Sequence, residues 1–181
     1  MNNIPVLFSE EEIRARVKEL GEQISFDFAD KNPLFVGVLK GCFIFMSDLL
    51  RSVSIPCEMD FMVVSSYNGT KTTGSVKLLK DLSEDVTNRD IILCEDILDS
   101  GLTLSYLSCL LQARGAASVK VVTLLEKEVD HAITPDYCGF KCPADAFVIG
   151  YGLDHNERYR NLPYVGLFDP KTQEKAPNGV D

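Results

Sequence analysis

Residues 91–104 run without interruption from an apolar strand pattern, through a polar turn, into a helix pattern. The stretch begins with Ile91-Ile92-Leu93-Cys94, a short apolar run of the kind found in buried parallel strands. It ends where Leu104, Leu107 and Leu111 recur at helical spacing. This order predicts a strand, a loop and the first turn of a helix.

The same order occurs earlier in the chain. Residues 34–39 form a continuous apolar run, Lys40 and Gly41 follow as a turn, and a second apolar segment with a helical pattern begins after them. A β-branched run at 119–125, followed by Glu126 and Lys127, predicts a further strand. Repeated alternation of strand and helix predicts an α/β fold with a mostly parallel sheet and ligands at the carboxyl ends of its strands. The residues expected to be buried in the helix after Lys40 are Phe43, Phe45, Met46, Leu49 and Leu50.

The turn after the strand at 91–94 has residues suited to a phosphate group. Ser100 and Thr103 provide hydroxyls, and Gly101 lets the backbone approach a ligand closely. The first N–H groups of a helix lack partners within the helix and attract anions. The pattern therefore favours a phosphate site at the start of this helix.

Three carboxylates, Glu95, Asp96 and Asp99, directly precede that site. They would repel a phosphate unless they bind sugar hydroxyls or a hard cation such as Mg²⁺, which takes a few protein oxygens together with substrate phosphates. The turn therefore indicates a phosphosugar site with a metal nearby. The alternative is an ordinary crossover in which the acids are solvated and Ser100 is a helix cap.

Composition limits the classes of protein that fit. A chain of 181 residues with 45% hydrophobic residues can bury one substantial core, which predicts a single domain spanning 1–181. The net charge of -9 argues against binding to nucleic acid or to an anionic membrane. The six cysteines are scattered, mostly in apolar segments, and no apolar run is long enough to span a bilayer. A cytoplasmic protein with buried, reduced thiols is expected.

The remaining segments have simpler predictions. Ser9 and Glu12 form a capping-box pattern ahead of an amphipathic first helix. Strands are expected at 59–64, 76–79 and 164–168, and the helix that begins near Leu104 should end at Arg114-Gly115. The polar segment 65–75 is typical of a mobile loop or an open hairpin. Residues 170–181 are expected to be a flexible tail.

The nonapeptide Glu95-Asp96-Ile97-Leu98-Asp99-Ser100-Gly101-Leu102-Thr103 closely resembles the phosphoribosyl pyrophosphate (PRPP) motif of type I phosphoribosyltransferases, in their hypoxanthine-guanine branch. The resemblance extends from about Leu34 to Leu167. It implies a central, mostly parallel sheet flanked by helices, with a small hood built from the chain termini and a flexible active-site loop. It also implies a homodimer or homotetramer and a purine salvage enzyme that uses Mg²⁺, PRPP and a 6-oxopurine to make IMP or GMP.

By this resemblance, Asp99 is the catalytic base, and the acidic turn binds the ribose and the 5'-phosphate. The residues assigned to ribose and 5'-phosphate are Glu95, Asp96, Asp99, Ser100, Gly101, Leu102 and Thr103. The residues assigned to pyrophosphate are Lys40, Gly41, Ser66, Tyr67 and Arg160, with a cis peptide bond before Lys40. The segment around Ser66 and Tyr67 is expected to close over the site.

The purine would bind to Lys127, Phe147, Val148 and Asp154. Lys127 would donate to the 6-oxo group and Phe147 would stack on the ring, although Phe147 taken singly is more typical of a core residue. The resemblance assigns metal ions to Glu95, Asp96 and Asp154. His155 and Glu157, on the following turn, are expected to be solvated.

One segment departs from the family pattern. Relatives usually follow the lysine that corresponds to Lys127 with a proline and basic residues, whereas this chain has Glu128-Val129-Asp130-His131.

Two other functions remain open. One is a nucleotide-binding transcriptional regulator with the same fold, which the acidic charge disfavours. The other is a phosphoribosyltransferase for another base, such as xanthine or a pyrimidine.

Overall fold

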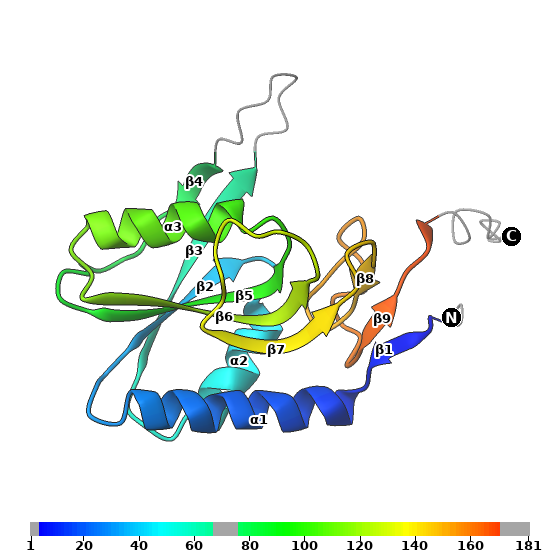
Figure 1. Ribbon diagram of the computed structural model, residues 1–181, viewed down its shortest axis with the longest axis horizontal. Coiled ribbons are helices and arrows are strands. Elements are labelled where there is room, and N and C mark those ends of the chain that lie inside the picture. Colours follow the sequence, from blue (N-terminus) through cyan, green and yellow to red (C-terminus); the bar gives the residue numbers. More distant parts are fainter. Residues whose placement is uncertain (1–3, 67–75, 171–181) are drawn as a thin grey trace, which may run out of the picture.

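In the computed structural model, residues 4–66 and 76–170 are described, and they form a layered α/β fold (Figure 1). The helices are α1 (Glu10–Asp27), α2 (Phe43–Ser52) and α3 (Leu102–Ala113). The strands of the main sheet are β2 (Leu34–Leu39), β3 (Glu58–Ser66), β4 (Val76–Lys80), β5 (Asp90–Leu98), β6 (Ser118–Lys127) and β7 (Tyr137–Cys142). The strands of a smaller sheet are β1 (Val6–Phe8), β8 (Val148–Ile149) and β9 (Val165–Leu167).

The main sheet has the strand order β4-β3-β2-β5-β6-β7. Every neighbouring pair is parallel except β3 and β4, so the predicted mostly parallel sheet is confirmed. Strands β2, β5 and β6 lie side by side, and their carboxyl ends therefore meet at one edge. The sequence patterns had predicted these three strands but neither β7 nor β1.

Helices cover both faces of the main sheet, with α3 on one face and α1 and α2 on the other (Figure 1). Side chains alternate between the faces along each strand, as the pleat requires. In β2, Phe35 packs in the core with α1 and α2, and the next residue, Val36, packs with α3. Both side chains are fully buried, which explains why this strand has an uninterrupted apolar sequence.

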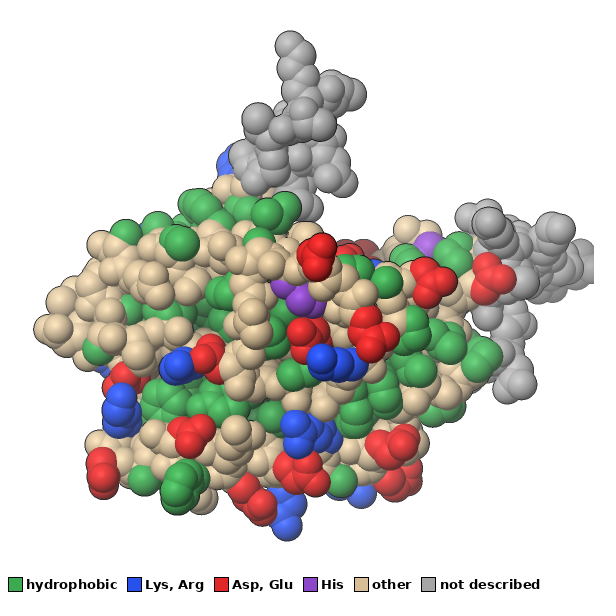
Figure 2. Space-filling view, viewed as in Figure 1, with side chains coloured by type: hydrophobic (Ala, Val, Ile, Leu, Met, Phe, Trp, Pro, Cys, Tyr) green, Lys and Arg blue, Asp and Glu red, His purple; other side chains and the backbone are tan. Residues whose placement is uncertain are grey.

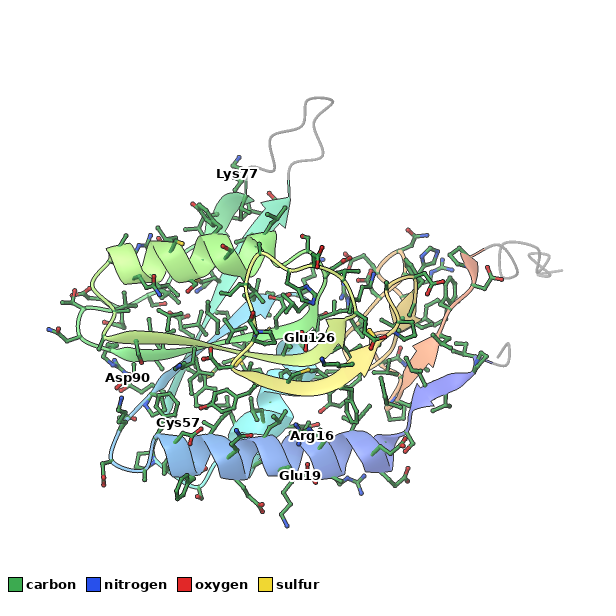
Figure 3. All side chains as sticks on the ribbon, viewed as in Figure 1. Arg16, Glu19, Cys57, Lys77, Asp90 and Glu126 are labelled. Carbon is green, nitrogen blue, oxygen red and sulfur yellow. The ribbon has the colours of Figure 1, made fainter. Side chains whose placement is uncertain are left out.

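Helix α1 begins at the predicted capping box. The Ser9 hydroxyl accepts from the Glu12 N–H, and the Glu12 carboxylate accepts from the Ser9 N–H. Four apolar residues that recur at helical spacing along this helix, Ile13, Val17, Leu20 and Ile24, are all buried. Arg16, labelled in Figure 3, joins this helix to β7 by donating to the carbonyls of Cys138 and Gly139.

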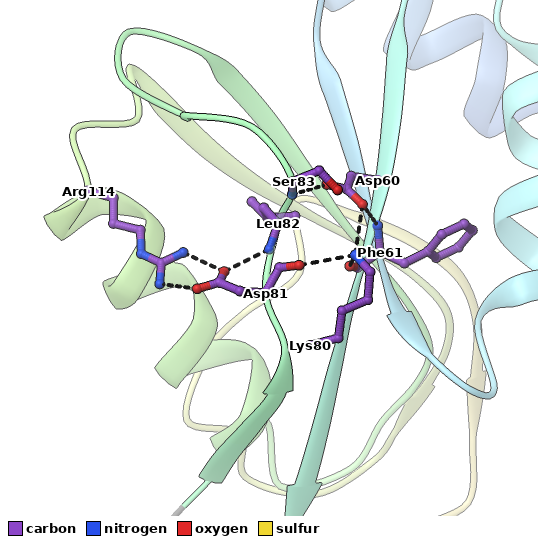
Figure 4. A network of polar contacts seen from close by, with 7 residues as sticks. All are labelled: Asp60, Phe61, Lys80, Asp81, Leu82, Ser83 and Arg114. Carbon is purple, nitrogen blue, oxygen red and sulfur yellow. Dashed lines mark hydrogen bonds and ion pairs between the residues drawn. The ribbon is translucent and has the colours of Figure 1, made fainter.

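A polar network fixes the base of the β3–β4 hairpin against the end of α3 (Figure 4). The Arg114 guanidinium donates to both carboxylate oxygens of Asp81 at 2.6 Å, and this pair lowers the pKa of Asp81. Lys80 bonds to Asp60 and to the carbonyls of Phe61 and Asp81. The two strands pair antiparallel as far as Ser66 and Val76, and the loop predicted between them lies largely outside the described residues.

The smaller sheet has the order β1-β9-β8 and joins the amino-terminal strand to segments near the carboxyl end. It is the predicted hood.

Two burial predictions were wrong. Phe43 is 44% exposed because it lies on the outer face of the first turn of α2, and Cys109 is exposed on α3. Among the described residues, no helix is long and apolar enough to cross a membrane.

Candidate active site

The carboxyl ends of β2, β5 and β6 surround two cavities. The first, of about 260 Å³, lies between the turn after β2 and the turn after β5. The second, of about 250 Å³, lies between β6 and the segment around β8. Asp99 and Ile97 line both cavities, so the two form neighbouring parts of one site.

The turn between β5 and α3 forms one wall of the first cavity. Residues 97–104 all line it, including Ser100, Gly101 and Thr103. Gly101 is the residue before the helix and has a left-handed backbone with φ of 74°, a conformation that glycine adopts without strain. The cap position of α3 is thus Gly101 and not Ser100, although the Ser100 hydroxyl accepts from the Leu102 N–H at 3.5 Å.

Glu95 and Asp96 are largely withdrawn from solvent beside this turn. Burial, and next the proximity of Asp96, raise the pKa of Glu95 well above its usual range. Burial likewise raises the pKa of Asp96. Within the described part of the chain, Glu95 Oε2 is buried without a hydrogen-bond partner. A buried carboxylate oxygen with no partner fits a site for a cation or for sugar hydroxyls.

The turn after β2 packs directly on Asp96. The peptide bond between Leu39 and Lys40 is cis, as the family resemblance implies. A Cβ atom added to Gly41 would lie 1.7 Å from Asp96 Oδ2. Only glycine therefore fits at this position with the carboxylate in place.

Two cations expected to bind pyrophosphate meet near this turn. Lys40 Nζ lies 3.2 Å from Glu157 Oε1, and Arg160 contacts Glu157 Oε2 at 3.3 Å. Arg160 also pairs with Asp154 at 2.8 Å and donates to the carbonyl of Gly152. The bonds from Lys40 and then Arg160 lower the pKa of Glu157. Glu157 thus bridges the two cations at the surface.

The second cavity brings together the residues expected to bind a purine. Lys127, Phe147, Val148 and Asp154 all line it with Asp99. The Phe147 ring is 44% exposed, so it is not the core residue that its type alone suggested. Lys127 Nζ lies 3.2 Å from Asp99 Oδ2. An aromatic face, a cation and a carboxylate can together bind and deprotonate a flat heterocycle.

The expected metal ligands do not form a single cluster. Among the described residues, no group of three acidic, histidine or cysteine side chains could hold a metal ion. Glu95 lines the first cavity, and Asp96 and Asp154 line the second. Sites for Mg²⁺ often supply only one or two carboxylates, with substrate phosphates and water completing the shell.

The sequence profile of the phosphoribosyl transferase domain matches residues 7–157. The chain belongs to this family. This phosphoribosyltransferase is 54% identical over 172 residues to the hypoxanthine-guanine phosphoribosyltransferase of Bacillus subtilis, a match that covers 93% of this chain and 95% of that protein. It is 49% identical over 173 residues to the enzyme of the same name from Streptococcus mutans, which covers 94% of this chain and 96% of that protein.

Solved structures agree with the sequence comparison. A crystal structure of a hypoxanthine phosphoribosyltransferase from Staphylococcus aureus superimposes with a TM-score of 0.90 and 45% identity, covering 95% of each chain. The phosphoribosyltransferase fold expected from the acidic turn is therefore confirmed.

The turn after Asp154 makes contacts that the sequence did not predict. Glu157 is exposed, as expected, and it also bridges the two cations. His155 packs against Phe147 and Phe168, with ring centroids 5.5 and 4.6 Å apart. No local pattern shows such contacts. Ser66 ends β3 at the hairpin, and Tyr67 lies outside the described residues, so the expected closing segment stays a prediction.

The bridging carboxylate leads to one prediction. If Lys40 and Arg160 bind pyrophosphate as expected, Glu157 competes with it, so Glu157→Gln should tighten product inhibition by pyrophosphate about two- to fivefold, the range for an exposed ion pair. Inhibition constants measured at low and high salt test this, because screening should shrink the difference. Glu84→Gln, an exposed acid lining none of the cavities, should behave as the wild type. Weaker pyrophosphate binding in Glu157→Gln would contradict the competition.

Proposed function

We propose that this protein transfers the 5-phosphoribosyl group of PRPP to hypoxanthine or guanine, giving IMP or GMP and pyrophosphate in purine salvage. The observation that carries the proposal is the position of Asp99, which lines both the cavity beside the phosphate turn and the cavity with Phe147. A carboxylate at this junction can act on the base where it meets the sugar.

The first cavity suits PRPP. The turn from Asp99 to Thr103 offers backbone N–H groups and hydroxyls to the 5'-phosphate. Lys40 and Arg160 lie together where they can neutralise the charge that develops on departing pyrophosphate. Ser66 and Tyr67 are proposed to approach the same group as the loop closes. Exclusion of water protects a reactive sugar carbon from hydrolysis.

Mg²⁺ fits the acidic groups beside that cavity. Glu95 and Asp96 would hold one ion, and Asp154 a second. When bound, Mg²⁺ supplies positive charge that polarises the oxygens of the diphosphate. Activity without added divalent cation in chelated buffer would contradict this assignment.

The second cavity suits a 6-oxopurine. Lys127 can donate only, which matches the 6-oxo group and not the amino group of adenine. Phe147 offers a ring face, and the backbone at Val148 can read the edge of the base. Asp99 then takes the N7 proton as N9 attacks the ribose carbon and the bond to pyrophosphate breaks.

Three further features belong to the proposal. All six cysteines are free, which supports a reducing compartment such as the cytoplasm. The shared family fold supports a homodimer or homotetramer, which sedimentation would distinguish. A single domain spanning the chain would give one cooperative unfolding transition in calorimetry.

Pyrophosphate release tests the activity directly. Purified protein is mixed with PRPP and one base at a time, with and without Mg²⁺. We expect release with hypoxanthine or guanine and Mg²⁺. Release only with xanthine or a pyrimidine would support the other phosphoribosyltransferase. No release with any base, together with calorimetric binding to DNA or RNA, would support a regulator.

Lys127→Gln should change the choice of base. Loss of a charged donor to the 6-oxo group should lower kcat/KM for hypoxanthine by about 10- to 100-fold. Adenine should lose far less, since it does not use this donor. Lys141→Gln is the matched control, because Lys141 is exposed on β7 and lines neither cavity. Equal losses for both bases would contradict the assignment of Lys127.

A further inference from the structure

Residues 128–133, which contain the departure from the family pattern, pack against the phosphate turn. The His131 Nδ1 atom contacts the backbone carbonyl of Asp99. The next residue, Ala132, donates its N–H to the carbonyl of Ser100 at 2.9 Å. Two successive carbonyls of the turn therefore bond to two successive residues of this segment.

These bonds fix the direction in which the turn presents its N–H groups. In a planar trans peptide, the C=O and the N–H of the same unit point in opposite directions. With the Asp99 carbonyl toward His131, the Ser100 N–H points away from His131. With the Ser100 carbonyl toward Ala132, the Gly101 N–H also points away from this segment. Successive N–H groups on one side form an anion-binding concavity.

The phosphate cavity lies on the side away from this segment. Asp99, Ser100 and Gly101 line the cavity, whereas none of its described lining residues belongs to 128–133. The segment is also packed closely behind the turn, because a Cβ atom on Gly101 would lie 3.2 Å from Ile133 Cγ2. The segment therefore packs against the side of the turn that is opposite the cavity.

The other nitrogen of the His131 ring faces a carboxylate. Nε2 lies 3.6 Å from Glu126 Oε1 near the end of β6, and the two side chains are only 10% and 16% exposed. Figure 3 labels Glu126, and Figure 2 shows acidic and histidine atoms gathered over this region. A carbonyl oxygen only accepts, so Nδ1 must carry a proton in the contact with Asp99. Glu126 lies on the opposite side of the ring, with Oε1 beyond hydrogen-bond distance of Nε2.

We propose that His131 is a positioning residue for the 5'-phosphate of PRPP, acting through the Asp99 carbonyl to aim the turn's N–H groups into the cavity. This inference rests on the proposed function. It gives the unusual Glu128–His131 sequence a role on the sugar-phosphate side of the site rather than on the base.

Two amide variants separate the two ring contacts. In His131→Asn the side-chain amide lies near the position of Nδ1 and can still donate to the Asp99 carbonyl. In His131→Gln the amide lies nearer the position of Nε2 and can reach Glu126 instead. Loss of one hydrogen bond that orients the turn should raise KM for PRPP about tenfold in His131→Gln and in His131→Ala. His131→Asn should stay within about twofold of the wild type by the same reasoning.

The readouts are KM for PRPP, KM for hypoxanthine, kcat and calorimetric binding of PRPP. We expect the KM for hypoxanthine to stay unchanged, and Asp130→Ala, in the same segment but exposed, to match the wild type. Equal values for His131→Asn and His131→Gln, or an unchanged KM for PRPP in His131→Ala, would overturn the proposal. If the wild type neither binds PRPP nor releases pyrophosphate, the proposed function fails instead. Thermal melts show whether each variant is folded, and the Asn and Gln pair decides the question if the alanine variant is not.

Discussion

Asp99→Asn should lower turnover with hypoxanthine by about 100- to 10,000-fold, the range for loss of a positioned general base. The amide keeps the size of the carboxylate but cannot take the N7 proton. Asp99 is 65% exposed at the junction of the two cavities, so the change should leave the fold intact. Steady-state and single-turnover rates, with PRPP affinity from calorimetry, provide the measurement.

The affinity of this variant for PRPP distinguishes a catalytic role of Asp99 from a role in substrate binding. The Asp99 side chain pairs with Lys127, while the phosphate turn is held through backbone atoms. The affinity for PRPP should therefore change little. Asp130→Asn removes a nearby exposed carboxylate and should have normal turnover. Unchanged turnover in Asp99→Asn would refute the base assignment, and an equal loss of PRPP affinity would place Asp99 in binding instead.

Gly41→Ala should both destabilise the protein and inactivate it. Its Cβ atom would lie 1.7 Å from Asp96 Oδ2, so the turn or the buried carboxylate must move. Overpacking of this kind costs about 1–3 kcal/mol of unfolding free energy. A shift of about 1 Å in Lys40 or Asp96 can lower kcat/KM by about 100-fold. Denaturant unfolding and initial rates measure the two effects.

A second substitution tests the cause of that loss. Asp96→Ala in the Gly41→Ala background removes the carboxylate that the added methyl group would strike. The double variant should therefore be more stable than the sum of the single effects predicts. Additive losses would mean that the contact with Asp96 is not the reason. A Gly41→Ala protein with normal stability and activity would mean that the turn adapts freely.

The sequence alone determined the elements with strong local patterns. The apolar run of β2 and the turn from β5 into α3 follow from spacing within a few residues, because strand and helix periods are local properties. The end of β5 did not follow from the sequence, because the strand continues through Glu95 and Asp96 to Leu98, past the apolar run that ends at Cys94. The capping box at Ser9 predicted the first turn of α1 for the same reason. Parallel strands place their carboxyl ends together, so the meeting of Lys40, Glu95 and Lys127 at one edge also followed from the pattern.

Only the tertiary structure decided which side chains oppose one another across that edge. Lys40 and Glu157 are 117 positions apart, and His131 and Asp99 are 32 apart. Edge strand β7 and the pairing of β1 with β9 likewise depend on partners distant in the sequence. Such contacts depend on how whole layers pack, because a side chain in a turn has no period of its own to indicate its partner. The backing of the phosphate turn by residues 128–133 is therefore visible only in the folded chain.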